Sequence, residues 1–320
     1  MKNKFENVKV SKLPKSQVEI EAEIAASALK TAHETAIKQS KETLEIPGFR
    51  VGHAPENMII KHVGEMKLLE QAAGIALDTE YGNILTEHNI RAIGMPKITI
   101  TKLALGNPLG FKIITTVLPE ISFDSYSEIA KSESGEKSEG FSASDEEVEK
   151  VIEDLKKRDA ENFKDSEELR KKIKENLVEQ KIFQAKEKRR LAIAEKMIEK
   201  AGIDLPDLLV EHELEVMIGQ FKGDIERAGL TYEGYLQQIN KKEEDIKNEW
   251  RKNAENKASL QLILNHIAGK EKIKPDENMV KKEMEHILSH HKDAERFRVR
   301  MYVENLLLNE AVFQFLEGDK

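Results

Sequence analysis

The residues of this chain with the most specific chemical potential lie in one short segment, Gly48-Phe49-Arg50-Val51-Gly52-His53-Ala54-Pro55. Two glycines permit backbone angles that other residues avoid, so the segment predicts a tight loop that can present Phe49 and Arg50 to solvent. Arginine favours phosphate and carboxylate groups, and an aromatic neighbour suits docking to a partner. The alternative is an ordinary connection between helices with Phe49 buried in the core, and the spacing alone favours neither interpretation.

A second group of reactive side chains consists of histidines near the end of the chain. His286 and His290 are four residues apart on a predicted helix, with Glu283 and His291 nearby, and this spacing could hold a metal on one helix face. No further ligands accompany them, so we interpret the group as a solvated helix end and expect no metal.

Catalytic and phosphate-binding patterns are absent from the sequence. The remaining His, Asp and Ser residues form neither a triad nor a nucleophile elbow. The glycines of Gly94-Met95-Pro96 and of Gly106 to Gly110 predict turns, since no Lys-Ser/Thr pair follows them. We therefore expect no catalytic residue and no cofactor.

The composition indicates a helical protein of more than one domain. The 320 residues contain 39% hydrophobic, 34% charged and 5% aromatic residues, which suggests much exposed helix. There is no cysteine, so disulfides and thiolate catalysis are excluded. The start of the chain lacks the apolar stretch of a signal peptide, and no apolar run approaches the roughly 20 residues of a membrane helix. We expect a cytoplasmic protein without a membrane partner.

Charge is distributed unevenly along the chain, whose net charge is −8. Residues 1–118 carry 15 Lys and Arg against 13 Asp and Glu, while residues 119–320 carry 36 against 46. Nucleic acid repels the acidic residues 119–320. We therefore expect an RNA-rich partner to bind to residues 1–118.

The elements around the loop predict an α+β domain over residues 1–118. Alternating apolar positions predict strands at 5–12 and 17–24, and two more at 97–105 and 110–118. One helix is predicted from about Ala25 to Thr43, and another from Pro55 to Tyr81. The fold class is thus an antiparallel sheet with two helices that present the loop at their junction.

Residues 119–144 are rich in Ser, Glu and Gly and predict an acidic flexible linker. The alternative for part of this segment is an arm that packs along the next domain. Ser144 and Glu147 then form a capping-box pattern that begins a helix through about Ala160.

Residues 145–320 predict an extended all-α domain with long helical arms. A run of helix-forming residues from Ser166 to Ala201 would be roughly 54 Å long, and Gly202 is placed to end it. Further helices are predicted after Pro206, after Thr231, and near 241–269, 275–291 and 293–317.

The apolar stripes of this helical part have two interpretations, a helix–helix core or an open surface for unfolded chains. The second requires apolar patches within a charged rim, with Met adaptable to many sequences. The candidates for binding such chains are Leu209, Met217, Phe221, Leu264, Met301 and Phe313.

The loop resembles the ribosome-docking signature of the trigger factor family, Gly-Phe-Arg-x-Gly-x-x-Pro, in all five fixed positions: Gly48, Phe49, Arg50, Gly52 and Pro55. The segment Ala201 to Pro206 and the helix after it resemble the family's C-terminal domain. Two positions depart from the family pattern, because Val51 and His53 stand where basic residues are common.

The resemblance implies an ATP-independent chaperone that docks beside the ribosomal tunnel exit and shields nascent polypeptides. The docking residues would be Gly48, Phe49, Arg50, Val51, Gly52, His53 and Pro55. The implied partners are a tunnel-exit protein and rRNA of the large subunit, together with unfolded chains, and a homodimer away from the ribosome stays open. The family's FKBP-type prolyl isomerase domain is not expected here, because Asp159 to Asp165 is too short to contain it.

Three alternatives remain at this point. The first is a ribosome-independent cytosolic holdase, which the departures at Val51 and His53 leave open. The second is a divergent prolyl isomerase, which the missing domain disfavours. The third is an assembly scaffold in which every apolar stripe is core.

Overall fold

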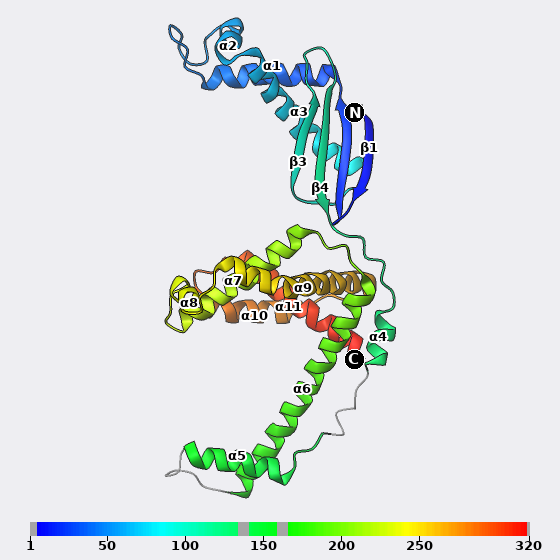
Figure 1. Cartoon of the computed structure of the whole chain (residues 1–320), viewed down its shortest axis with the longest axis vertical. Helices are drawn as coiled ribbons and strands as arrows, with labels where there is room; N and C mark the ends of the chain where they lie inside the picture. Colours follow the sequence, from blue (N-terminus) through cyan, green and yellow to red (C-terminus); the bar gives the residue numbers. More distant parts are fainter. Residues whose placement is uncertain (1–4, 134–140, 159–165, 319–320) are drawn as a thin grey trace. The chain divides into compact units, whose positions relative to one another are not determined.

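The structure is a computed structural model that describes residues 5–133, 141–158 and 166–318 (Figure 1). By their contacts the residues divide into two compact units, Met1–Glu120 with Asp204–Arg251, and Ile121–Ile203 with Lys252–Lys320. The predicted junction at Asp159 to Asp165 lies outside the described residues.

The N-terminal part is built on a four-stranded antiparallel sheet in the order β1-β2-β4-β3. The strands are β1 (Phe5–Leu13), β2 (Gln17–Ile24), β3 (Ala92–Lys102) and β4 (Leu109–Val117). Every second residue of β2 is buried, as expected for a strand with one face against a core. The predicted α+β class is confirmed.

Helices α1 (Ala26–Thr43) and α3 (Glu65–Glu87) pack against this sheet, and α2 (Glu56–Val63) connects them. Small side chains on both long helices allow a close approach of their backbones. The buried alanines of this interface are Ala28, Ala32, Ala36, Ala72, Ala73 and Ala76.

The single helix predicted from Pro55 to Tyr81 is wrong, because the chain breaks at Gly64. This glycine has a φ of 93°, which a helix cannot contain, and α3 begins at the next residue. The apolar spacing continues across the break, so periodicity alone did not reveal it.

The turn predicted at Gly94-Met95-Pro96 is also wrong, because these residues lie within β3. The pairing of β3 with β4 is irregular between Ile93 and Lys97, where Gly94 has a φ of 74°. Since β3 is an edge strand, Pro96 can remain in it without breaking the sheet.

Residues 119–133 are not an exposed linker. They include helix α4 (Tyr126–Ser132), and Phe123, Tyr126 and Ile129 are buried in the core of the second unit. The hydroxyl of Tyr126 donates a hydrogen bond to Glu271. The alternative of a packed arm is therefore correct for this part, while residues 134–140 of the predicted linker lie outside the described residues.

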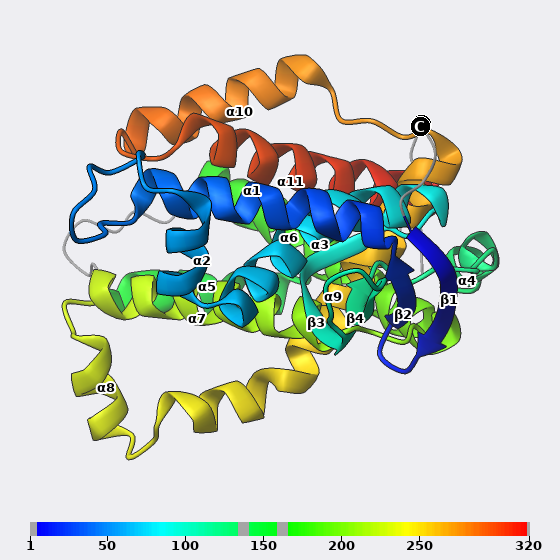
Figure 2. The same ribbon diagram turned by 90° about the horizontal axis from the view of Figure 1, so that it is seen from above.

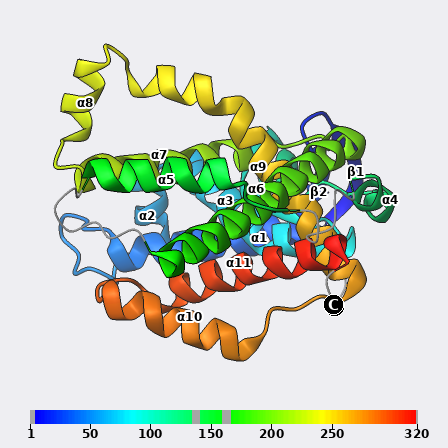
Figure 3. The same ribbon diagram turned by 90° about the horizontal axis from the view of Figure 1, so that it is seen from below.

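The other helices agree with the predicted all-α half. They are α5 (Asp145–Arg158), α6 (Glu167–Ala201), α7 (Asp207–Arg227), α8 (Tyr232–Gln238), α9 (Glu243–Glu271), α10 (Glu277–His290) and α11 (Arg296–Glu317). Within the second unit α5 packs on α6, and α10 runs beside α11 (Figure 3).

Helix ends were predictable from their capping residues. The hydroxyl of Ser166 accepts a hydrogen bond from the backbone N–H of Leu169 at 3.2 Å, and Gly202 ends α6 in the left-handed conformation. At the start of α5, the N–H of Ser144 donates to Glu147 and the N–H of Glu147 donates to the Ser144 hydroxyl, which confirms the capping box.

Helices α6 and α11 are joined by an ion-pair network around Arg190. Its guanidinium donates to Glu310 at 2.7 Å and to Glu317 at 2.8 Å, and the side chains of Arg190 and Glu317 are only 14% and 2% exposed. The guanidinium also lies over the ring of Phe313, 5.2 Å from its centroid. This network fixes the end of α11 against α6.

The stability of the protein should fall in acid partly through Glu310. Its hydrogen bonds with Arg190 lower the pKa of this carboxyl from 4.5 to about 2. Because the folded-state pKa lies below the unfolded value, the stabilisation is present above pH 4.5 and is lost as pH falls toward 2. In urea titrations, Glu310→Gln should be less stable than wild type near neutral pH, and the difference should shrink below pH 4.5. A difference that is the same at every pH would contradict this account.

Candidate docking loop and apolar surfaces

The loop between α1 and α2 consists of two consecutive tight turns. The N–H of Phe49 donates to the carbonyl of Ile46 at 3.0 Å, and the N–H of His53 donates to the carbonyl of Arg50 at 3.0 Å. Gly48 and Gly52 occupy the third position of each turn with φ values of 87° and 85°. A turn with positive φ at its third position strongly favours glycine, which explains the spacing of the two residues.

The turns are anchored to α1 and to a small apolar core. The N–H of Gly52 donates to the carbonyl of Lys41 at 3.1 Å, which ties the second turn to the last part of α1. Two side chains that flank the tip, Ile46 and Ala54, are 6% and 4% exposed. They belong to a small core under the loop with Ile37, Ile59 and Leu68. This anchoring makes the tip a preorganised loop.

The tip itself is exposed. Phe49 is 40% and Val51 is 44% exposed, and Arg50 and His53 are also exposed. Among the described residues Arg50 forms no hydrogen bond or ion pair through its side chain. Phe49 is therefore not part of the core, and the alternative of a buried Phe49 is wrong. The loop lies at the end of α1 that is far from the sheet (Figures 1 and 2).

Pro55 has a structural role beside the tip. It is the N-cap residue of α2, one position earlier than the first-turn position expected from the sequence. Its φ of −63° and ψ of 148° place the chain in extended conformation before the helix begins. The seven predicted docking residues thus lie in one loop, in which Gly52 is half-buried and the other six are exposed.

Two predicted binding residues of the helical part are core residues. Leu264 is 2% exposed and packs in the centre of the second unit, and Met217 is 9% exposed on α7. Neither side chain is available to an unfolded chain in this structure. Their helical spacing was correct, but spacing does not identify which stripe of a helix faces its neighbours.

Two predicted aromatic residues are also engaged in packing. Phe221 meets Tyr232, Tyr235 and Trp250 with ring centroids 6.3, 5.6 and 5.1 Å apart. Phe313 is half-buried under the Arg190 guanidinium. Both predictions are corrected in the same way, because these rings stabilise the helical packing.

The exposed apolar residues lie elsewhere. Of the six candidates, Met301 is 56% exposed and Leu209 is half-buried. Among the described residues of the second unit, the most exposed aromatic side chains are none of the predicted candidates. They project from α6 and α11 and are Phe183, Phe297 and Tyr302, at 64%, 66% and 59%. The spacing of Phe297 and Met301, one helical turn apart, was the available signal.

The histidine group shows local contacts only. The rings of His286 and His290 are 4.8 Å apart, and Nδ1 of His290 lies 3.0 Å from the carbonyl of His286. In the described parts of the chain, no group of three or more His, Cys, Asp or Glu side chains could hold a metal ion. No helix within those parts is long and apolar enough to cross a membrane.

The fold and the loop define a class of protein in which an α+β domain presents an exposed, hydrogen-bonded loop and is joined to long helices. Two family profiles match the chain, "Bacterial trigger factor protein (TF)" over residues 6–155 and "Bacterial trigger factor protein (TF) C-terminus" over residues 165–317. The chain belongs to the trigger factor family of chaperones, as the loop resemblance predicted. Residues 156–164 separate the two matches, so no domain-sized segment lies between them.

Individual relatives of the chain are also trigger factors. A trigger factor of Rhodococcus opacus is 33% identical over 149 residues, which are 47% of this chain and 31% of that protein. A trigger factor of Carboxydothermus hydrogenoformans is 23% identical over 382 residues, covering 87% of this chain and 90% of that protein. For several relatives, including the Rhodococcus protein, the match spans only about a third of their length.

A solved structure from a study of promiscuous substrate recognition by the trigger factor chaperone has a TM-score of 0.62. It is 16% identical, and the alignment covers 98% of this chain and all of that chain. At this identity the likeness supports the fold.

Proposed function

We propose that this protein is an ATP-independent chaperone that docks on the large ribosomal subunit and shields nascent polypeptides. Residues 1–118 would dock through Phe49 and Arg50, and residues 145–320 would hold the client. The proposed partners are a protein of the tunnel exit, the adjacent rRNA and the emerging chain. Action at the ribosome would place the protein in the cytoplasm.

The observation that carries this proposal is the exposed Phe49–Arg50 pair on an anchored double turn. A preformed loop loses little conformational entropy on binding. Less of the free energy of its contacts is therefore offset by ordering the loop. The unpaired guanidinium can bind a phosphate of rRNA or a carboxylate of a protein, while Phe49 can enter an apolar pocket. Arginine and aromatic residues are also the types that most often dominate interfaces.

The proposed client surface rests on the exposed apolar residues of the helical unit. These side chains are separated by charged residues, so each apolar patch is small. A client segment can therefore make only a weak contact at each patch. Weak contacts exchange quickly, which allows release without a nucleotide. We also propose that the protein is not an enzyme, since residues 156–164 cannot form the isomerase domain of the family.

The direct test is co-sedimentation with vacant ribosomes for wild type and Phe49→Ala/Arg50→Ala. Loss of two central interface residues should weaken binding more than tenfold, and wild-type binding should weaken with salt. The matched control is Met66→Ala/Lys67→Ala, which removes an exposed apolar and an exposed basic side chain from α3. Equal loss in the control, or no loss in the loop variant, would contradict the proposal.

A ribosome-independent holdase is the second candidate. Val51 and His53 leave it open, because Arg50 is the only permanent cation between Gly48 and Pro55, which weakens the attraction to rRNA. In that case neither wild type nor the loop variant would sediment with ribosomes, while both would slow aggregation of an unfolded client equally. Failure of both to slow aggregation would instead favour a scaffold.

A further inference from the structure

The turn between β1 and β2 contacts the segment that begins α7, in the same compact unit but 188 residues further along the chain. The N–H of Ser16 donates a hydrogen bond to the carboxylate of Asp204 at 3.0 Å, and the Ser16 hydroxyl donates to the carbonyl of Asp204 at 2.5 Å. The ammonium of Lys15 donates to the carboxylate of Asp207 at 2.6 Å. The turn therefore holds α7 by backbone, hydroxyl and charge together.

Asp207 connects three elements. Its Oδ2 atom accepts from Lys15, and its Oδ1 atom lies 3.2 Å from a guanidinium nitrogen of Arg251 on α9. The hydrogen bond from Lys15 lowers the pKa of Asp207, so the ion pair remains charged near neutral pH. The next residue, Leu208, lies against Gly94 of β3, where an added Cβ would come 2.7 Å from the Leu208 Cδ2 atom. We call the following contacts the clasp: those of Lys15, Ser16 and Gly94 with Asp204, Asp207 and Leu208.

The turn of the clasp has a backbone conformation that is costly for its residues. Lys15 and Ser16 have φ values of 60° and 48°, which residues other than glycine adopt uncommonly. Glycine would form the turn more easily, but it has no side chain that could reach α7. A conformational cost that is retained at a contact points to a role for that contact.

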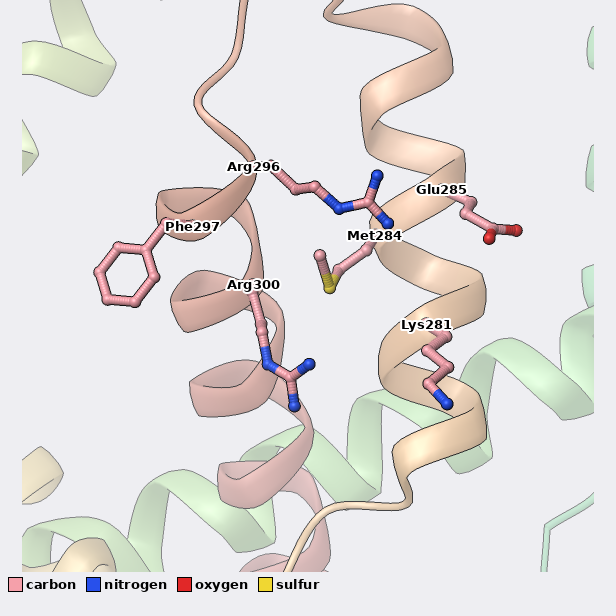
Figure 4. A pocket seen from close by; sticks show the side chains of 6 residues that line it. All are labelled: Lys281, Met284, Glu285, Arg296, Phe297 and Arg300. Carbon is pink, nitrogen blue, oxygen red and sulfur yellow. The ribbon is translucent and has the colours of Figure 1, made fainter.

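The clasp joins elements that are not neighbours along the chain. Ion pairs within a hairpin are different, as for Arg300 of the α10–α11 hairpin (Figure 4), which pairs with Glu277 only 23 residues away. The clasp instead connects the N-terminal sheet to a helix that the chain reaches only after α4, α5 and α6. It is therefore placed to decide whether α7 moves together with the sheet.

We propose that the clasp is a conformational device that makes residues 204–251 follow the orientation of the N-terminal sheet, and that its opening frees α7 to swing. The Ser16 hydrogen bonds define the closed geometry. The side chains of Lys15 and Asp207 are 59% and 47% exposed, so their ion pair is weakened by salt and allows release. This inference goes beyond the proposed chaperone function and is tested on the free protein.

The test measures a distance within the first unit by double electron–electron resonance. The chain has no cysteine, so Thr99→Cys on β3 and Gln220→Cys on α7 provide two unique and exposed sites for nitroxide labels. Gln220 lies roughly 20 Å along the helix from Asp207, so a small rotation at the clasp moves its label far. The clasped protein should give one narrow distance distribution that broadens at high salt.

The decisive variant is Lys15→Glu/Asp204→Ala, which reverses the charge that faces α7 and removes the carboxylate that accepts from the turn. The ratio of detached to clasped molecules should rise roughly tenfold or more, and the distance distribution should become broad. The matched control, Lys30→Glu/Glu226→Ala, makes the same charge changes at exposed positions of α1 and α7 outside the clasp. It should keep the narrow distribution.

Hydrogen exchange of the Ser16 amide provides a second measurement, because this N–H donates to Asp204. Its exchange should be slow in the wild type and in the control, and fast in the clasp variant. A broad distance distribution in the wild type, or a narrow one in the clasp variant, would overturn the inference. Neither result would affect the proposed docking on ribosomes, which is measured separately.

Discussion

Replacing Arg190 by alanine should reduce the free energy of unfolding by about 3 kcal/mol. The substitution leaves Glu317, which is 2% exposed, as a buried charge without its guanidinium partner. Breaking a buried ion pair costs about 3–5 kcal/mol, and we expect the lower end because Lys186 stays 3.4 Å from Glu317. Loss of the guanidinium also removes its contact with the Phe313 ring.

Urea unfolding near neutral pH measures this effect. The control is Arg190→Met/Glu317→Met, which removes both charges and should be much closer to wild type in stability. A loss below about 1 kcal/mol for Arg190→Ala, as for an exposed ion pair, would show that the network contributes little.

Replacing Leu264 by alanine should destabilise the helical unit by about 2–5 kcal/mol. The side chain is 2% exposed in the centre of the core, where a cavity would remain. Met301→Ala is the matched comparison, since this residue is 56% exposed and its truncation should change stability by less than about 0.5 kcal/mol.

The same two variants separate core from client surface. Met301→Ala should weaken binding of an unfolded client while thermal stability is retained, and Leu264→Ala should do the reverse at temperatures where it remains folded. If Leu264→Ala kept full stability and lost client binding, the sequence interpretation of Leu264 as a binding residue would be correct after all.

The parts that the sequence predicted well depend on local chemistry. The ends of α6 follow from Ser166 and Gly202, and the double turn follows from two glycines that require positive φ. Each of these features is determined by one residue and its local backbone conformation. They can therefore be predicted without knowing which distant segments pack nearby. The family resemblance of the loop depended on the same residues.

The parts that failed depend on contacts between segments distant in the sequence. Phe123 and Tyr126 are buried because α4 packs on helices far along the chain, although their neighbours read as a linker. Leu264 and Met301 have similar spacing signals, and only the packing of their helices decides which is covered. Gly64 shows that apolar periodicity alone does not locate helix ends, because the pattern continues through a residue at which the helix breaks.

The most direct measurement of the central claim is photo-crosslinking from the loop tip to ribosomes that carry a nascent chain. Phe49→p-benzoylphenylalanine should form a crosslink to a large-subunit protein or rRNA at the tunnel exit. The same replacement at Met66, which is 64% exposed outside the loop, should form little or none. Absence of a ribosomal crosslink from position 49, or equal crosslinks from both positions, would contradict docking through this loop.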